Sequence, residues 1–324
     1  MVKTIDVTAL GELLIDFTEN GLSGQGNPLL EANPGGAPCN VLAMLQKLGR
    51  RTAFIGKVGK DLWGERLRQA VEEVGIDSRD LLMDNEVHTT LAFVRKKPDG
   101  DRDFAFYRNP GADMCLSASE VREEPIAQSR IFHFGSLSMT HPQVREATAA
   151  ALRMAKTHGC LISFDPNLRE PLWPSLDEAH EQIDFGLRCC DVLKISDNEL
   201  QWFTGKEDFD EGIAALQARY AIPLILLSKG RDGSSAYYHG LRVDAAPFLQ
   251  ENTVETTGAG DTFCACVLNF LLDHDLASLN AEDLKSMLCF ANAAASIITT
   301  RKGALRVMPT REEIEGLLAA RARQ

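Results

Sequence analysis

Short apolar runs alternate with longer amphipathic stretches along most of the 324-residue chain. The apolar runs are rich in Val, Ile, Leu and Phe and end at glycine or polar residues, a pattern typical of buried β-strands. We expect strands at 4–12, 51–59, 130–136, 160–164, 191–196 and 222–228.

The amphipathic stretches place apolar residues on one helical face. In 37–49, the residues Val41, Met44, Leu45 and Leu48 form a single stripe, and Gly49 ends the pattern. Similar patterns predict further helices at 61–75, 142–159, 262–274 and 281–300.

Residues 89–109 differ, because two β-rich runs flank the turn-forming KPDGD at 97–101, which predicts a β-hairpin. Elsewhere the alternation of strand and helix favours a parallel, doubly wound sheet with helices on both faces. Because the chain shows no repeat and no low-complexity linker, we expect one α/β domain over 1–324.

Composition narrows the function. The chain has 34 basic and 46 acidic residues, a net charge of −12, which disfavours the clustered Lys and Arg of a nucleic-acid surface. No apolar run approaches the ~20 residues that cross a membrane, so no membrane partner is expected. The N-terminal MVKTIDVTALGE reads as a strand followed by acids rather than a signal peptide, so we expect a cytoplasmic protein.

The eight cysteines and seven histidines form no metal-site pattern. Cys189 and Cys190 are adjacent, Cys264 and Cys266 are two apart, and no C-x-x-C pair occurs. We assign no zinc site and expect most cysteines to be small buried apolar residues.

Polar and charged residues directly follow several predicted strands. The ends of parallel strands lie along one edge of a sheet, where open α/β sheets bind ligands. An ordinary polar surface explains any one of these loops, but four such loops together favour a binding site. They contain Glu12 and Asp16, 165–169, 196–199 and 228–233.

The stretch ETTGAGDTF (255–263) leads into the helix expected at 262–274. Amides at a helix N-terminus are unpaired and partly positive, and the small residues 258–260 let an anion approach them, so the loop suits a phosphate. The chain has no P-loop motif and no G-x-G-x-x-G after its first strand. Asp261 could take a proton from a hydroxyl that attacks phosphorus, and the alternative is that it only caps the helix.

Two motifs resemble the signatures of the PfkB family of ribokinase-like carbohydrate kinases. TTGAGDTF is similar to its C-terminal signature and NPGGAPCNVLAMLQKLG to its N-terminal one; two signatures in the right order are more specific than one. GELLIDF, FYRNPGADM, FHFGS, SFDPNLREPLWPS and KISDNELQWFTG resemble the fructokinase branch, and the likeness covers nearly the whole chain. The resemblance implies a ribokinase-like three-layer α/β/α sandwich with a mostly parallel central sheet and a small β lid from about 14–31 and 88–113.

The resemblance further implies an ATP-dependent sugar kinase, with fructokinase activity as the first expectation. Asp261 matches the catalytic base, and the amides around Gly258, Ala259 and Gly260 match the anion hole. The positions that match or fit sugar contacts are Asp16, Gly35, Gly36 and Asn40, with Arg108 and Arg169 as nearby cations.

ATP and Mg²⁺ are the implied cofactors. Glu199 matches the acid that acts on Mg²⁺ through water, and the alternative is a solvent-facing residue early in a helix. The positions implied for the nucleotide are Ser228, Gly230 and Gly233 in its loop, Asn292 and Gly303 at the adenine end, and Lys194.

Three positions depart from the family pattern. Ser196 replaces the Asn of N-x-x-E, and Ser228 replaces the Thr of the nucleotide loop but keeps a hydroxyl. Glu255 stands where many relatives have an Asp that helps to hold a monovalent cation, which puts potassium dependence in doubt.

Other functions remain open. A 2-keto-3-deoxygluconate kinase, a ribokinase, a non-catalytic sugar sensor, and a lyase or glycosidase on this fold are alternatives. The intact Gly-Ala-Gly-Asp weighs against a non-catalytic sensor, and the loop 228–233 weighs against a lyase or glycosidase. Relatives often dimerise through the lid, so a homodimer is a further expectation.

Overall fold

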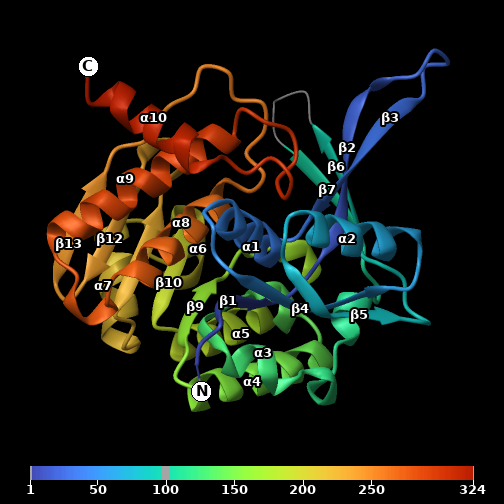
Figure 1. Ribbon diagram of the computed structural model, residues 1–324, viewed down its shortest axis with the longest axis horizontal. Helices are drawn as coiled ribbons and strands as arrows, with labels where there is room; N and C mark the ends of the chain where they lie inside the picture. The colour runs from blue at the N-terminus through green and yellow to red at the C-terminus, as the bar shows by residue number, and fades with distance from the viewer. Residues whose placement is uncertain (1, 97–101, 324) are drawn as a thin grey trace.

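The computed structural model describes residues 2–96 and 102–323 (Figure 1). Within these ranges the largest sheet has nine strands, in the order β13-β12-β11-β10-β9-β8-β1-β4-β5. Their bounds are β1 (Ile5–Leu10), β4 (Thr52–Gly59), β5 (Asp77–Asp84), β8 (Ser129–Gly135), β9 (Leu161–Asp165), β10 (Val192–Ser196), β11 (Leu224–Ser228), β12 (Ser234–Tyr238) and β13 (Leu241–Ala245).

From β5 to β11 every neighbouring pair is parallel, whereas β12 and β13 pair antiparallel at the edge. The predicted mostly parallel sheet is therefore confirmed, with an antiparallel edge. The chain leaves β1 toward β4 and later returns on the other side as β8. Such a switch point opens a crevice at the carboxyl ends of the strands.

Helices cover both faces of this sheet (Figure 1). In β11, Leu224 and Leu226 pack into one core, and Ile225 and Leu227 pack into the other, as the two-residue period of a strand requires. The first core contains α1 (Ala37–Lys47), α2 (Leu62–Glu73), α8 (Ala259–Asp273), α9 (Ala281–Ile298) and α10 (Arg311–Arg321). The second contains α3 (Glu123–Ala127), α4 (Pro142–Thr157), α5 (Leu176–Cys189), α6 (Asp197–Thr204) and α7 (Phe209–Arg219).

A second, four-stranded sheet projects from the body at the upper right of Figure 1. Its order is β3-β2-β6-β7, with bounds β2 (Leu14–Leu22), β3 (Pro28–Gly35), β6 (Leu91–Lys96) and β7 (Arg102–Tyr107). β6 and β7 are antiparallel, so the predicted hairpin is confirmed, although its turn at 97–101 lies outside the described residues. The parallel pairing of β2 with β6 joins two segments that are distant in sequence.

Successive residues of β2 point to opposite faces of the small sheet. Phe17 packs against Trp63 of α2, with ring centroids 5.0 Å apart. The neighbouring Asp16 therefore points the other way. We refer to this four-stranded unit as the small sheet.

Candidate active site

Asp261 lies at the start of α8, next to the crevice of the large sheet. The N-cap is Gly258, with φ at +79° and no side-chain cap, and Asp261 is the third helical residue. The capping alternative for Asp261 is therefore wrong. Its Oδ2 instead accepts a hydrogen bond from Asn40 Nδ2 of α1 at 2.8 Å. Burial raises the pKa of Asp261 above its ordinary value, against the opposing effects of Asn40 and Lys194.

The other atom of the Asn40 amide has a different environment. Asn40 is 3% exposed, and its Oδ1 has no hydrogen-bond partner within the described part of the chain. A buried acceptor without a partner costs free energy, so such groups normally meet a ligand or water. A hydroxyl donor placed beside Asp261 would satisfy it.

A buried cation faces the beginning of α8. The Lys194 ammonium would lie 3.1 Å from a Cβ built at Gly260, and it forms an ion pair with Asp165 at 3.0 Å. Burial alone would lower the pKa of Lys194, but the carboxylates of Asp165 and Glu199 raise it, so the ammonium stays charged. From the sequence, Asp165 was placed at the end of a strand but was given no role. Its position at the carboxyl end of a strand was the only sequence signal that pointed to the site.

The amides that start α8 complete this positive region. First-turn amides of an α-helix have no partner within the helix. The Ala259 amide donates to the Thr256 carbonyl at 3.3 Å, so this member of the predicted anion hole is partly engaged in the turn. Together with Lys194, the helix N-terminus can hold an anion.

Glu199 is not a solvent-facing residue. Its Oε2 accepts from the Ser196 amide and hydroxyl, at 2.9 and 2.8 Å, and closes a capping box on α6. Its Oε1 accepts from the Leu168 amide at 2.8 Å. Burial opposes ionisation, but Lys194 and these donors hold the pKa of Glu199 below its ordinary value. Ser196 thus retains a cap where relatives have Asn.

Asp16 brings a second carboxylate from the small sheet toward Asp261. A methyl group at Gly35 would lie 2.7 Å from Asp16 Oδ2, so glycine is required for this close approach. Burial raises the pKa of Asp16 to about 7; the nearby Arg169 lowers it, and the charges of Glu255 and Asp261 raise it. Arg169 is exposed and also acts on Asp261. These residues therefore form one electrostatic cluster.

Several other predicted residues have their polar groups engaged within the protein. Gly36 is the N-cap of α1, where a Cβ would lie 2.4 Å from the Glu12 carbonyl. Asn292 accepts from Ser234 at 2.9 Å and donates to two carbonyls of 245–246. Ser228 is the last residue of β11, and Gly230 and Gly233 lie in the turn between β11 and β12.

Gly303 lies against the small sheet. Its amide donates to Glu255 Oε2 at 3.2 Å, and a Cβ there would lie 3.1 Å from Asn33 of β3. The other oxygen of Glu255 accepts from Thr257 Oγ1. Glu255 therefore links the loop before α8 to the loop that contains Gly303.

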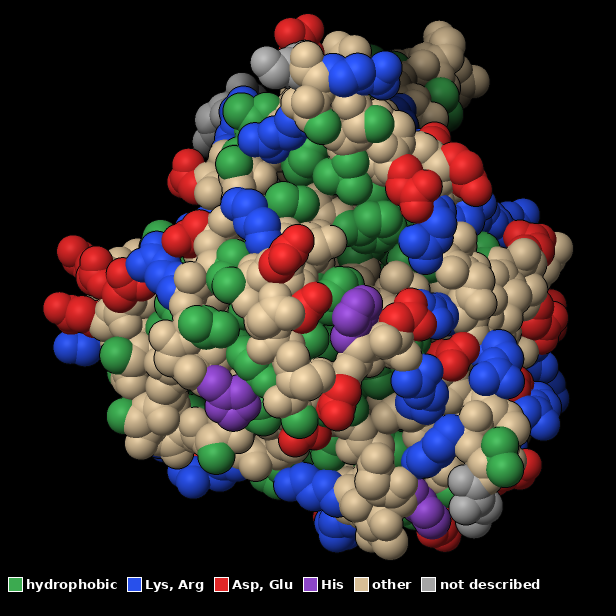
Figure 2. All heavy atoms as spheres, turned by 60° about the vertical axis from the view of Figure 1, so that its left-hand side comes forward, with side chains coloured by type: hydrophobic (Ala, Val, Ile, Leu, Met, Phe, Trp, Pro, Cys, Tyr) green, Lys and Arg blue, Asp and Glu red, His purple; other side chains and the backbone are tan. Residues whose placement is uncertain are grey.

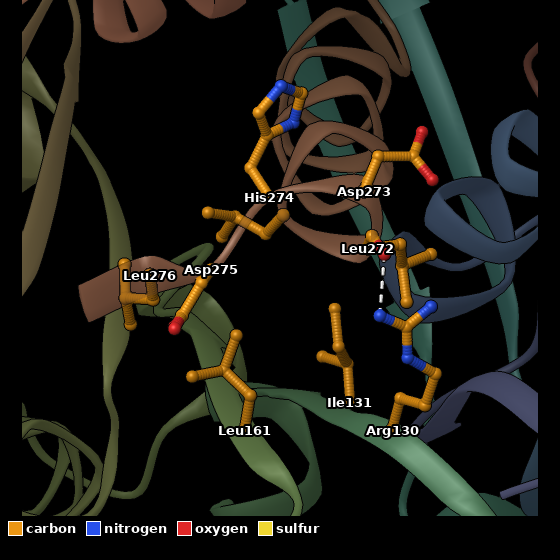
Figure 3. Close-up of a pocket in the computed structure, with 9 residues that line it drawn as sticks. Arg130, Ile131, Leu161, Leu272, Asp273, His274, Asp275 and Leu276 are labelled. Carbon is orange, nitrogen blue, oxygen red and sulfur yellow. Dashed lines mark hydrogen bonds between the residues drawn. The ribbon is translucent and has the colours of Figure 1, made fainter. Parts of the chain in front are cut away.

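The cavity in Figure 3 belongs to a different part of the molecule. Arg130, Leu161 and the end of α8 line its volume of about 410 Å³. At 1.5 Å per helical residue, Leu272 lies roughly 16 Å along α8 from Asp261. This cavity is therefore separate from the cluster around Asp261.

Three further observations bear on partners. On the face shown in Figure 2, basic and acidic side chains are interspersed. Within 2–96 and 102–323, no helix is long and apolar enough to span a membrane, and no group of three or more His, Cys, Asp or Glu could hold a metal ion.

Comparison with known proteins gives consistent matches along the chain. A family model described as "pfkB family carbohydrate kinase" matches residues 4–311. A protein of Arabidopsis thaliana named probable fructokinase-2 is 40% identical over 310 residues, which cover 94% of this chain and 93% of that protein.

Solved structures match equally far. The structure of fructokinase with bound ATP from Xylella fastidiosa has a TM-score of 0.89 at 28% identity, over 98% of this chain and 99% of that one. A double mutant of fructokinase from Vibrio cholerae O395, in its form with fructose, ADP and potassium ion bound, has a TM-score of 0.86 at 28% identity with the same coverage.

Proposed function

The chain belongs to the pfkB family of carbohydrate kinases, and on that basis we propose that it is an ATP-dependent fructokinase. It transfers the γ-phosphoryl group of ATP to D-fructose and forms D-fructose 6-phosphate and ADP. Likeness to solved sugar kinases also confirms the ribokinase-like fold expected from the sequence.

The observation that carries this proposal is the environment of Asp261. Its carboxylate is held by Asn40 at 2.8 Å, beside a helix N-terminus and the buried ammonium of Lys194. A base, an anion-binding helix end and a fixed positive charge are the groups that phosphoryl transfer to a hydroxyl requires.

In the proposed reaction, Asp261 accepts the proton of the sugar 6-hydroxyl while the oxygen of that hydroxyl attacks the γ-phosphorus. The O6–P bond forms while the bond from phosphorus to the β,γ-bridging oxygen breaks, and ADP retains that electron pair. The amides around Gly258, Ala259 and Gly260 and the Lys194 ammonium stabilise the negative charge on the transferring group. The raised pKa of Asp261 makes it a better proton acceptor than an ordinary aspartate.

In this proposal, the protein supplies few direct ligands to Mg²⁺. Mg²⁺ keeps several waters and binds mainly through substrate phosphates, so a site without three protein ligands still fits it. Glu199, whose oxygens accept from Ser196 and Leu168, would act on Mg²⁺ through water. The bound ion neutralises phosphate charge. Potassium use is a separate proposal, which depends on Glu255.

The sugar lies between the two sheets in this proposal. Asp16 and the unpartnered Oδ1 of Asn40 accept hydrogen bonds from sugar hydroxyls, and Gly35 and Gly36 allow the close approach. Arg169 supplies an exposed cation beside them. A direct sugar contact by Arg108 stays a prediction. Its side chain is 2% exposed, and its guanidinium donates to other residues of the protein.

The nucleotide extends from Lys194 along the turn formed by Ser228, Gly230 and Gly233. Asn292 shapes its adenine end, since its amide holds 245–246 in place. Gly303 stays an adenine-end prediction, and its observed contacts with Glu255 and Asn33 favour a place nearer the sugar.

The small sheet, which overlaps the predicted lid ranges of about 14–31 and 88–113, acts as a lid that excludes water in this proposal. Its outer residues Leu22, Leu29, Leu30 and Tyr107 are 69%, 47%, 44% and 66% exposed, which supports a homodimer formed through the lid. A cytoplasmic location and the absence of a nucleic-acid partner stay predictions.

A coupled ADP-release assay across fructose, glucose, ribose, adenosine and keto-deoxy acids tests the proposal. Fructose should give the highest kcat/KM. Robust turnover of a keto-deoxy acid or ribose, with none of fructose, would overturn the assignment of fructose as substrate but not the assignment as a sugar kinase. No ADP release with any of these acceptors would support the non-catalytic alternative.

A further inference from the structure

Both ends of the β6–β7 hairpin enter the body of the protein at one buried group of side chains. Thr90 precedes β6, and Arg108 follows β7. Asp113 joins them: its Oδ1 accepts from the Thr90 hydroxyl at 2.5 Å, and its Oδ2 accepts from Arg108 Nε at 2.8 Å. The side chains of Arg108 and Asp113 are each 2% exposed. We call Thr90, Arg108, Asp113 and Thr140 the hinge cluster.

The hinge cluster also reaches the turn after β8. Arg108 Nη1 donates to Thr140 Oγ1 at 2.8 Å, and Nη2 donates to the Leu137 carbonyl at 3.0 Å. Leu137 lies in the 3₁₀ turn η3 (Ser136–Met139), at the carboxyl edge of the large sheet. The small sheet is thus fixed by charge-assisted hydrogen bonds to the edge that forms the candidate site.

Two further contacts extend this connection on both sides. The Ile15 amide, next to Asp16 on β2, donates to the Thr90 carbonyl at 3.3 Å. The Ser136 amide donates to the Pro166 carbonyl at 3.1 Å, and Pro166 follows Asp165, the partner of Lys194. The hinge cluster therefore lies on a continuous hydrogen-bonded route between the sugar-facing strand and the phosphate-facing loop.

The packing leaves little freedom at this point. A Cβ at Gly111 would lie 1.9 Å from Thr90 Oγ1 and 2.7 Å from Asp113 Oδ1. Asp113 is buried, and Thr90 and Arg108 engage both of its carboxylate oxygens, so it is placed to hold geometry. Small errors in the placement of a substrate-holding element reduce productive binding strongly.

We propose that Asp113, through Arg108, is a positioning residue that sets the orientation of the small sheet over the site. This inference rests on the proposed kinase function. Correct orientation places Asp16 against the sugar and keeps water from the transferring phosphoryl group. Loss of Asp113 therefore weakens sugar binding and lets ATP react with water instead of sugar.

The test compares Asp113→Asn with a matched control, Asp80→Asn. Asp80 also forms a two-bond pair with Arg122, at 2.6 and 2.9 Å, but this pair joins β5 to the start of α3, away from the small sheet, and Arg122 is half exposed. Both substitutions keep side-chain size and remove one charge from an Arg–Asp pair. Wild-type enzyme is assayed first with the sugar that it turns over best, so failure of the proposed function appears there and not in the variants.

For Asp113→Asn we expect the sugar KM to rise about tenfold or more, with a smaller change in the ATP KM. The ratio of ADP to sugar phosphate should also rise above one. Asp80→Asn should lower the melting temperature and leave both readouts within about twofold of wild type. An unchanged sugar KM and product ratio in Asp113→Asn would overturn the inference.

A second variant covers the case in which Asp113→Asn does not fold. Thr140→Val keeps the side-chain size and removes the hydroxyl that accepts from Arg108 and donates to the Leu137 carbonyl. It should change the sugar KM and the product ratio in the same direction by a smaller factor. Wild-type values for both in folded Thr140→Val protein would count against the inference.

Discussion

The start of α8 and the small sheet both contribute residues to the candidate site, but they differ in how those residues are held. Around α8, the functional groups are backbone amides and buried charges, fixed by short contacts such as Asn40 to Asp261 and Asp165 to Lys194. The small sheet instead has exposed outer residues and is attached through β2, the hinge cluster and a parallel pairing of distant segments.

This difference suggests a division of labour. A preorganised, buried region stabilises charge that develops in the transition state and so acts on kcat. A projecting unit that supplies Asp16 acts on sugar binding and on the exclusion of water. Substitutions in the two regions should therefore affect different kinetic constants.

The largest effect is expected at the start of α8. Asp261→Asn keeps the size and the contact with Asn40 but cannot accept the proton, so kcat should fall by ~10²–10⁴. The ATP affinity should barely change, because the amides belong to the backbone. Steady-state kinetics and ATP titration measure both, and a near wild-type kcat would refute the role of Asp261.

Thermal stability gives a control for that variant. Burial raises the folded-state pKa of Asp261, so wild-type stability decreases as the pH rises from the unfolded value of 3.8 through the folded one. Asp261→Asn removes this loss, so its melting temperature at pH 7.5 should equal or exceed that of wild type. A clear decrease would mean that lost structure explains the lost activity.

Substitution of Asp16 in the small sheet should have a smaller effect, and on the sugar KM rather than on kcat. Asp16→Ala loses a charge-assisted hydrogen bond worth about 1.5–3 kcal/mol, so the sugar KM should rise roughly ten- to a hundredfold. The ATP KM should change much less. Glu19→Ala, at an exposed position of the same strand, is the matched control and should leave both KM values unchanged. Equal changes in the two KM values for Asp16→Ala would remove the distinction between the regions.

The sugar KM should also depend on pH. The pKa of Asp16 is raised to about 7, mainly by burial, so its carboxylate is charged above that pH and neutral below it. Because the charged form binds hydroxyls more strongly, the sugar KM should rise several-fold as the pH falls from 8 to 6. Asp16→Asn should abolish this dependence; an unchanged slope in that variant would assign the titration to another group.

The smallest effect concerns potassium. Both oxygens of Glu255 are engaged, by Thr257 and Gly303, so the longer side chain occupies space that an Asp would leave for a cation. Wild type should show weak activation by K⁺ over tetramethylammonium, and Glu255→Asp should increase that activation a few-fold. Stronger activation in wild type than in Glu255→Asp would show that Glu255 itself supports the ion.

The same contrast explains what the sequence could predict. The parallel strands, α1 and α8 were predictable because their apolar periods are local signals, and Gly49 closes the pattern of α1. The group around Gly258 and Asp261 was recognisable because the residues proposed to bind an anion at a helix N-terminus are consecutive. The pairing of Asp165 with Lys194 was missed, since it joins two strands whose contact exists only in the folded sheet.

Several other elements were missed, and not all of them lacked a signal: α5 buries Ala179, Ile183 and Leu187 on one helical face. The hairpin β12–β13, the edge strand β5 and the helices α5, α6, α7 and α10 were not identified from the sequence. β13 is mostly exposed, and α10 buries Ile314 alone, so neither has a strong apolar period. The engagement of Arg108 with Asp113 was also missed, because an arginine in a loop resembles a ligand-binding cation until its partners are seen.

In the proposed complex, the small sheet holds the sugar so that one terminal hydroxyl meets Asp261. The most direct measurement is the position of the phosphate on the product formed from fructose, ATP and Mg²⁺, determined by phosphorus and carbon NMR. We expect fructose 6-phosphate. Phosphate on any other oxygen, or no transfer to fructose, would contradict this expectation.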